Sequence, residues 1–270
     1  MLTVAVGALC AAAWRPNTAM PAGSGDRGPE DYDRGRPGYP PAALDVAALS
    51  AASTVLDLGA GTGKLTRLLA SRFDRVLAVE PADAMRRMLA TVCPDAEALA
   101  GSAEAIPLAG ASVDAVFVAE AFHWFDGPRA LAEIARVLRP AAALVLLWNV
   151  PAGPTEPSVE AVERLVDEVG PSRDDFGADP MDLVARAYAS GEWRAALAAS
   201  PFEELRETRL PNPQTLDRDG FVAFLASMGW LADLPDAERT VVLGEIRSLL
   251  RADEYRRPWA THVCWTRLGP

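Results

Sequence analysis

Between residues 54 and 150, short apolar segments alternate with amphipathic ones, and this alternation restricts the fold more than any other feature of the chain. The apolar segments are rich in β-branched residues and indicate buried strands: TVLDLG, RVLAVE, VDAVFVAE and AALVLLWNV. The segments between them, such as KLTRLLASRF and GPRALAEIARVLRP, repeat apolar residues at helical spacing. Alternating strands and helices predict a mostly parallel sheet with helices on both faces.

The rest of the chain departs from this alternation and suggests four regions. Residues 1–29 are rich in small residues, glycine and proline and are expected to form a disordered N-terminal extension. One domain is expected over residues 30–270, with residues 51–150 as its cofactor-binding core. Residues 151–200 read as a helical cap inserted after the fifth strand, and residues 201–270 as terminal strands and helices. A late antiparallel strand on such a sheet is common.

Charge and cysteine usage narrow the class of protein. With 26 basic and 37 acidic residues the net charge is −11, which disfavours a nucleic-acid binder because such proteins replace phosphate counterions with basic residues. The three cysteines are far apart in sequence, and no His/Cys/carboxylate cluster has metal-ligand spacing. We therefore expect a cytoplasmic monomer or homodimer without a metal and without a membrane segment; the apolar stretch at residues 1–14 is too short to span a bilayer.

The stretch LDLGAGTGK at residues 56–64 predicts a glycine-rich turn between a strand and a helix, and three ligand chemistries use such turns. A triphosphate loop needs GxxxxGK[ST], but Leu58 stands at its first glycine and Leu65 at its Ser/Thr. A dinucleotide fingerprint needs GxGxxG, but Lys64 stands at its third glycine. An acid two residues before the first glycine, Asp57, would repel a pyrophosphate and attract an ammonium group.

This pattern resembles motif I of the class I S-adenosylmethionine-dependent methyltransferases. The resemblance implies a Rossmann-like, seven-stranded α/β sheet that binds S-adenosylmethionine at its carboxyl edge. Asp57 would pair with the amino acid end of that cofactor, and Glu80, at the end of the next strand, would accept its ribose hydroxyls. The turn residues expected to let the nucleoside approach closely are Gly59, Ala60, Gly61 and Gly63.

The same resemblance extends to further cofactor contacts. Pro81 and Met85, in the stretch EPADAM, would border the adenine. Ser102, Ala103 and Glu104, in GSAEAIPL, would lie at the adenine edge or pack nearby, although many relatives have Asp at the Ser102 position. Glu120, at the end of the fourth strand, is placed in the cofactor site as well.

Several longer segments are similar to the small-molecule methyltransferases of the ubiquinone/menaquinone and trans-aconitate type: YDRGRPGYP, GSAEAIPL, AEAFHWFD and RVLRPAAALVLLWN. The first implies that Tyr32 and Arg36 fold over the cofactor and touch its carboxylate. In the third, His123 is the candidate general base, because a histidine of near-neutral pKa suits proton removal from a hydroxyl or carboxylic acid acceptor. Trp124 would form an apolar wall for the substrate. A packed turn is the competing interpretation of these two residues.

The sequence therefore predicts an enzyme that moves a methyl group from S-adenosylmethionine to a small molecule, with no nucleic-acid or membrane partner. Two alternatives stay open at this point. One is an NAD(P)-dependent oxidoreductase on a related fold, and the other is a non-catalytic module that binds S-adenosylmethionine. The acceptor atom, whether oxygen, nitrogen or carbon, does not follow from the fold.

Overall fold

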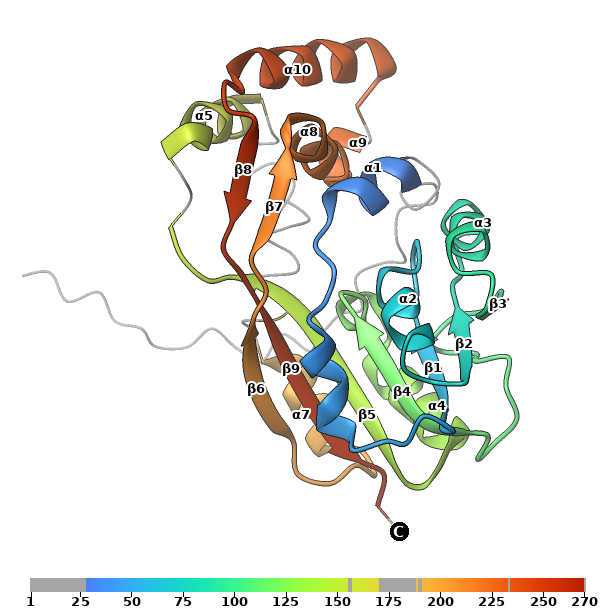
Figure 1. Ribbon diagram of the computed structural model, residues 1–270. Coiled ribbons are helices and arrows are strands. Elements are labelled where there is room, and N and C mark those ends of the chain that lie inside the picture. Colours follow the sequence, from blue (N-terminus) through green and yellow to red (C-terminus); the bar gives the residue numbers. More distant parts are fainter. Residues whose placement is uncertain (1–27, 155–156, 170–187, 189–190, 233, 270) are drawn as a thin grey trace, which may run out of the picture.

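A computed structural model describes residues 28–154, 157–169, 188, 191–232 and 234–269, and its centre is a seven-stranded sheet (Figure 1). The strand order is β3-β2-β1-β4-β5-β9-β6. The first five of these strands pair in parallel, and β9 pairs antiparallel with both β5 and β6. The strand bounds are β1 Thr54–Leu58, β2 Arg75–Val79, β3 Glu97–Leu99, β4 Val113–Ala119, β5 Leu138–Pro151, β6 Arg206–Pro211 and β9 Trp259–Arg267. The predicted mostly parallel α/β sheet is confirmed.

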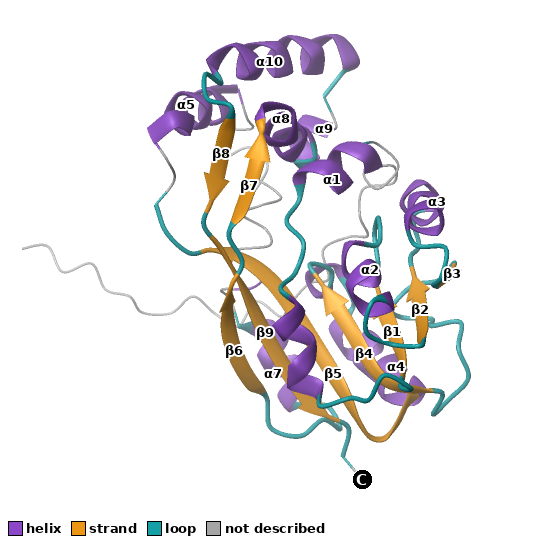
Figure 2. Cartoon of the chain, in the orientation of Figure 1, coloured by secondary structure: helices purple, strands orange, loops and turns teal. Residues whose placement is uncertain are grey.

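Helices cover both faces of this sheet because alternate strand residues point to opposite sides (Figure 2). On one face, Leu56 and Val116 pack with α4 (Gly127–Val137) and α7 (Glu192–Ala198). On the other face, Val55 and Phe117 pack with α2 (Lys64–Ala70) and the 3₁₀ helix η1 (Pro41–Ala47). The strands between these two layers are buried on both sides, as their near-continuous apolar runs predict.

A second, smaller layer lies beyond the carboxyl edge of the sheet and has its own apolar core (Figure 1). It contains a two-stranded antiparallel ribbon, β7 (Gln214–Asp217) with β8 (Glu254–Arg257). Around the ribbon lie η3 (Pro157–Val159), α5 (Glu160–Val169), α8 (Arg218–Ala226), α9 (Gly229–Ala232) and α10 (Asp236–Leu249). We call this layer the cap.

The composition of the cap differs from the sequence prediction, which assigned it to residues 151–200. Of the described residues in that range, those that contribute to the apolar core of the cap lie in η3 and α5. α7 instead packs on the sheet through Trp193 and Leu197. Residues 170–187 of the predicted insertion, and residues 1–27 of the predicted N-terminal extension, lie outside the described residues. Most of the cap comes from residues 214–257, between the last two strands of the large sheet.

The first helix connects the cap to the sheet. α1 (Pro29–Gly35) packs against α8 so closely that a Cβ on Gly35 would come within 2.1 Å of the Phe224 backbone nitrogen. From α1, above the carboxyl edge of the sheet, the chain runs down to η1, which packs on one face of the sheet (Figure 1). Within the described residues, no helix has the length and apolar character that crossing a bilayer requires.

Candidate active site

The glycine turn lies at the carboxyl end of β1 and has a left-handed backbone at three positions. Gly59, Gly61 and Gly63 have φ angles of 73°, 57° and 87°. Such angles are unfavourable for residues with a Cβ, so the glycines have a conformational role at these positions. At Gly59 there is a packing reason as well, because an added Cβ would lie 2.7 Å from the Ala121 side chain. Ala60, the remaining predicted turn residue, is buried beside them.

Asp57, in β1 two residues before this turn, is buried, with 1% of its surface exposed. Its Oδ2 atom accepts a hydrogen bond from the Thr66 hydroxyl at 2.6 Å. Its Oδ1 atom is buried and has no hydrogen-bond partner among the described residues. Burial raises the pKa of this carboxyl to about 7, although the bond from Thr66 acts in the opposite direction. A buried acceptor without a donor is costly and calls for an explanation.

Glu80, at the end of β2, holds the glycine turn in place. Its two carboxylate oxygens accept hydrogen bonds from the backbone nitrogens of Gly61 and Ala82, each at 2.8 Å. Burial raises its pKa, and the two backbone bonds partly offset this effect. Each carboxylate oxygen has a further lone pair, so the side chain can still accept hydrogen bonds from a ligand. Pro81 next to it is exposed, whereas Met85 is buried in the helix α3 (Asp83–Val92).

The loop after β3 is tied to the start of α4. Glu104 accepts a hydrogen bond from the Asp126 backbone nitrogen at 2.9 Å, and Ala103 is buried. Ser102 forms an isolated antiparallel bridge with Ala105 and is partly exposed. These contacts shape the loop. The adenine contacts of Ser102 and Ala103, and the packing of Glu104 near them, stay predictions.

Glu120 follows β4 and combines a partly buried carboxyl with an unusual backbone. Its φ angle of 52° lies in the left-handed region that non-glycine residues rarely adopt. Its Oε1 atom accepts a hydrogen bond from the backbone nitrogen of Asn149 in β5. Burial raises the pKa of this carboxyl to about 7, against the hydrogen bond from Asn149 and the charge of Arg36. Strained backbone at a ligand-binding edge is a recurrent feature of functional sites.

The segment with Tyr32 and Arg36 closes over this edge. Asp33 in α1 accepts hydrogen bonds from the Thr62 hydroxyl at 3.0 Å and from Arg67 at 2.7 Å, so the helix is bound to the glycine turn. Arg36 donates to the Ser227 hydroxyl at 2.8 Å and to its carbonyl oxygen at 3.1 Å. Its guanidinium also lies 5.5 Å from the centre of the Tyr32 ring. Arg36 therefore ties α1 to the cap, a role that sequence reasoning missed.

His123 lies in a short 3₁₀ helix, η2 (Phe122–Trp124), just after β4. The structure corrects the basis on which it was predicted to be a base, because its pKa is not near neutral. Burial lowers the pKa of His123 to about 3, and neither ring nitrogen has a hydrogen-bond partner among the described residues. Its ring centre lies 4.9 Å from that of Trp124, which is partly exposed. The imidazole is thus neutral at physiological pH.

Two polar groupings in the structure were not foreseen. At the carboxyl edge, Asn149 and Asn212 both donate to the Gly38 carbonyl oxygen, at 3.2 and 2.8 Å, and fix the segment after α1. On the outer strands, Glu207, His262 and Cys264 come together, although the sequence shows no cluster of metal-ligand spacing. The only signal for this cluster in the sequence is the alternation of His262 and Cys264 along one strand.

Comparison with known proteins identifies the family of the chain. Residues 56–146, which span the strands from β1 to β5, match the family model described as a methyltransferase domain. An uncharacterized methyltransferase of Mycobacterium tuberculosis is 39% identical, over 81% of this chain and 82% of its own. The chain belongs to the class I S-adenosylmethionine-dependent methyltransferases.

Two further comparisons support the assignment of this chain to the methyltransferase family. A methyltransferase-like protein of Schizosaccharomyces pombe is 33% identical over 82% of this chain and 83% of its own. A solved structure from Anaeromyxobacter dehalogenans, described as a type II methyltransferase, superposes with a TM-score of 0.62 at 28% identity. That comparison covers 87% of this chain and 99% of the other. Family membership decides against the oxidoreductase and in favour of an enzyme that transfers methyl groups.

Proposed function

We propose that the carboxyl edge of the sheet binds S-adenosylmethionine in the orientation that the sequence predicts. The observation that carries this proposal is the unpartnered Oδ1 atom of Asp57. An ammonium group would supply the missing donor, and it would stabilise the ionised carboxylate against the cost of burial. The amino acid end of the cofactor carries such a group.

The other contacts follow from the order of the strands. Glu80 lies on the neighbouring strand β2 and would accept the ribose hydroxyls through its remaining lone pairs. The adenine would then lie toward β3, between Met85 and the loop containing Ser102 and Ala103. Tyr32, held over the edge by α1, would exclude water from the cofactor.

When bound, S-adenosylmethionine supplies a methyl group activated by a sulfonium. The residues of the chain then have to position an acceptor in line with that group and shield the site from water. We infer that a small molecule is the acceptor, because the cap and α1 lie over the edge of the sheet. Glu120, His123 and Trp124, all at the end of β4, are the side chains we expect beside it. The predicted kinship with the ubiquinone/menaquinone and trans-aconitate type stays a prediction.

Calorimetric titration tests the orientation of the cofactor. Replacing Asp57 by Ala removes one charge-assisted hydrogen bond, worth about 1.5–3 kcal/mol, so affinity for S-adenosylmethionine should fall about ten- to hundredfold. Asp114→Ala is the matched control. Asp114 accepts from the Thr54 backbone nitrogen at the opposite end of β1, so its loss should leave affinity unchanged. Equal affinity of wild type and Asp57→Ala would refute the assignment.

Turnover requires a second experiment. The protein is incubated with cofactor carrying an isotopically labelled methyl group and a fractionated pool of metabolites. A labelled small molecule together with S-adenosylhomocysteine is the expected result, and its structure names the acceptor. Tight cofactor binding without any labelled product from small-molecule, protein or nucleic-acid fractions would indicate a binding module instead.

A further inference from the structure

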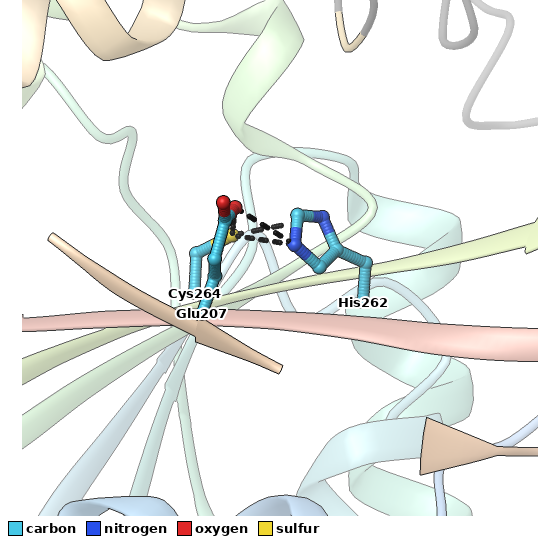
Figure 3. A group of neighbouring side chains, drawn as sticks. All are labelled: Glu207, His262 and Cys264. Atoms are coloured by element: carbon cyan, nitrogen blue, oxygen red, sulfur yellow. Dashed lines mark hydrogen bonds and ion pairs between the residues drawn. The ribbon is translucent and has the colours of Figure 1, made fainter. Parts of the chain in front are cut away.

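Three side chains that could bind a metal ion meet on the last two strands of the sheet, β9 and β6 (Figure 3). His262 and Cys264 are two residues apart in β9, so both side chains project from the same face of the sheet. Glu207, in the edge strand β6, is the direct cross-strand partner of Cys264. Strand register therefore brings together residues that are more than fifty positions apart in sequence.

The spacing of the three ligand atoms suits a single ion. Glu207 Oε2 lies 3.0 Å from His262 Nε2. Cys264 Sγ lies 3.5 Å from His262 Nε2 and 3.9 Å from Glu207 Oε2. Zinc bonds of about 2.0–2.3 Å at tetrahedral angles require ligand atoms roughly 3.2–3.6 Å apart. Each observed separation departs from that range by no more than a few tenths of an ångström.

We propose that Glu207, His262 and Cys264 bind one zinc ion, with water in the fourth position. A thiolate, an imidazole and a carboxylate form a mixed ligand set that suits zinc better than the hard cations calcium and magnesium. Binding forms three bonds from protein atoms to the metal, and the proton of the Cys264 thiol is released to solvent. The site is independent of the proposed cofactor orientation.

The surroundings of His262 favour ligation through Nε2. The Tyr188 hydroxyl lies 2.7 Å from Nδ1, the other ring nitrogen. If Nδ1–H donates to this oxygen, Nε2 carries the lone pair and lies next to Glu207, as in metal sites whose histidines are oriented by an outer hydrogen bond. Cys264 Sγ lies nearly as close to Nδ1, at 3.7 Å, as to Nε2, at 3.5 Å. His262 and Cys264 are buried, whereas the Glu207 side chain is 49% exposed and leaves an entry path from solvent.

Two arginines bear on the charge of the site. Arg194 donates to Glu207 Oε2 at 2.8 Å, and Arg209 donates to the Tyr188 hydroxyl at 3.3 Å. A zinc ion with two anionic ligands carries no net charge, so these guanidinium groups oppose it only weakly. The second oxygen of Glu207 is available to Arg194 when Oε2 binds metal. The ion would then fasten the edge strand β6 to β9.

Metal binding to the full chain tests this proposal. The protein is stripped with a chelator, the chelator is removed, and zinc is titrated in competition with a chromophoric chelator. We expect one ion per chain with a Kd below about 1 μM. Cobalt in place of zinc should give a thiolate-to-metal charge-transfer band and the intense visible bands of four-coordinate cobalt.

The variants separate this site from adventitious binding. Cys264→Ser and the half-exposed Glu207→Gln should each weaken zinc binding at least about 100-fold, and Tyr188→Phe about 10- to 100-fold. Cys93→Ser, which changes a buried cysteine at the end of α3, is the control and should bind zinc normally. Circular dichroism checks folding, and Glu207→Gln suffices if Cys264→Ser does not fold. No zinc binding by wild type, or undiminished binding by Glu207→Gln, would overturn the proposal.

Discussion

At the scale of single residues, the candidate active site contains buried polar atoms without hydrogen-bond partners in the described part of the chain, which lower the free energy of unfolding. Asp57 Oδ1 and both ring nitrogens of His123 are buried without hydrogen-bond partners among the described residues. Each such atom costs about 1–3 kcal/mol relative to a satisfied one. For Asp57 the proposed cationic cofactor group would account for this cost. For His123 the corresponding candidate is a donor group on the acceptor.

His123→Leu separates a functional histidine from an architectural one. Leucine removes two unsatisfied buried nitrogens at similar volume, so we expect the thermal midpoint to stay the same or rise. If His123 accepts the proton of the acceptor, turnover should fall about 10²–10⁴-fold. Thermal unfolding and steady-state kinetics on the same preparation measure both effects. A variant of lower stability with full turnover would make His123 a packing residue.

The low pKa of His123 removes this residue from the groups that can shape the dependence of activity on pH near neutrality. Burial places this pKa at about 3, so loss of a proton from His123 cannot produce an inflection in activity between pH 6 and 8. Any inflection there should come from Asp57 and Glu120, whose pKa values are about 7. The near-neutral histidine that the sequence suggested is not the titrating group.

At the scale of elements, α1 is the part that connects the cofactor edge with the cap. Asp33 binds α1 to the glycine turn. Arg36, the residue directly after α1, donates a hydrogen bond to Ser227 at the end of α8. The absence of a side chain at Gly35 lets α1 and α8 approach to backbone contact. This arrangement predicts that cofactor affinity depends on a helix-to-helix contact outside the glycine turn.

Gly35→Ala tests that dependence. The added Cβ would lie 2.1 Å from the Phe224 nitrogen and 2.3 Å from its Cα, and backbone atoms cannot rotate away. Overpacking costs about 1–3 kcal/mol and should displace α1 from its contact with α8. The affinity for S-adenosylmethionine should therefore fall about 5- to 150-fold. Gly38→Ala is the control, since nothing lies within 4 Å of a Cβ there. Equal losses in both variants would contradict the role of the contact.

The junction between α4 and β5 shows a second feature at this scale. α4 ends at Val137, and Pro140 belongs to β5. Ala141 follows with a φ angle of 60°, in the left-handed region that non-glycine residues rarely adopt. Alanine in this conformation is strained by about 1–2 kcal/mol.

Ala141→Gly should therefore stabilise the protein. Relief of the strain exceeds the entropy cost of glycine, leaving a net gain of about 0.5–1 kcal/mol. For a domain of this size such a gain raises the thermal midpoint by about 2–3 °C. The neighbouring Ala142→Gly is the control, because Ala142 is buried and has no positive φ angle, so glycine there should lower the midpoint. A lower midpoint for Ala141→Gly would disprove the strain argument.

At the scale of the whole molecule, the buried carboxyls make stability depend on pH in an unusual direction. Burial raises the pKa of Asp57 from 3.8 to about 7 and that of Glu120 from 4.5 to about 7. Between pH 4 and pH 7 these two carboxyls therefore hold more protons in the folded protein than in the unfolded chain, whereas His123 and His262, whose pKa values are lowered by burial, hold fewer. The contribution of the two carboxyls to the free energy of unfolding should fall as the pH rises through this range, and that of the two histidines should rise up to about pH 6.5, the pKa of an unfolded histidine.

Thermal melts of the cofactor-free protein between pH 5 and pH 8 measure this effect. We expect the midpoint of the wild type to fall with rising pH relative to that of Asp57→Asn combined with Glu120→Gln, whose amides do not titrate. His123 and His262 titrate in the same range but are common to both proteins, so their contributions cancel in the difference. Asp114 and Glu133, whose pKa values are lowered by arginine partners, act only at more acidic pH. A difference that stays constant from pH 5 to pH 8 would show that the two carboxyls are already ionised in the folded state.

The sequence alone determined the parallel sheet, the position of the glycine turn and the candidate acids Asp57 and Glu80. These features depend on periodicity and backbone conformation within a few residues, so a local reading of the chain is enough to find them. It could not divide residues 151–200 between the cap and the sheet, because both parts have the same helical periodicity. Burial decided that division.

The tertiary structure alone decided which distant residues meet and which polar atoms remain without partners. The pKa of His123, the approach of Gly35 to Phe224 and the junction of Glu207 with His262 and Cys264 all depend on strand register and packing between segments far apart in sequence. Desolvation depends on everything that surrounds a group, and the neighbours in the chain are only a small part of those surroundings. For this reason the sequence located the active site, while the chemical state of its residues followed only from the fold.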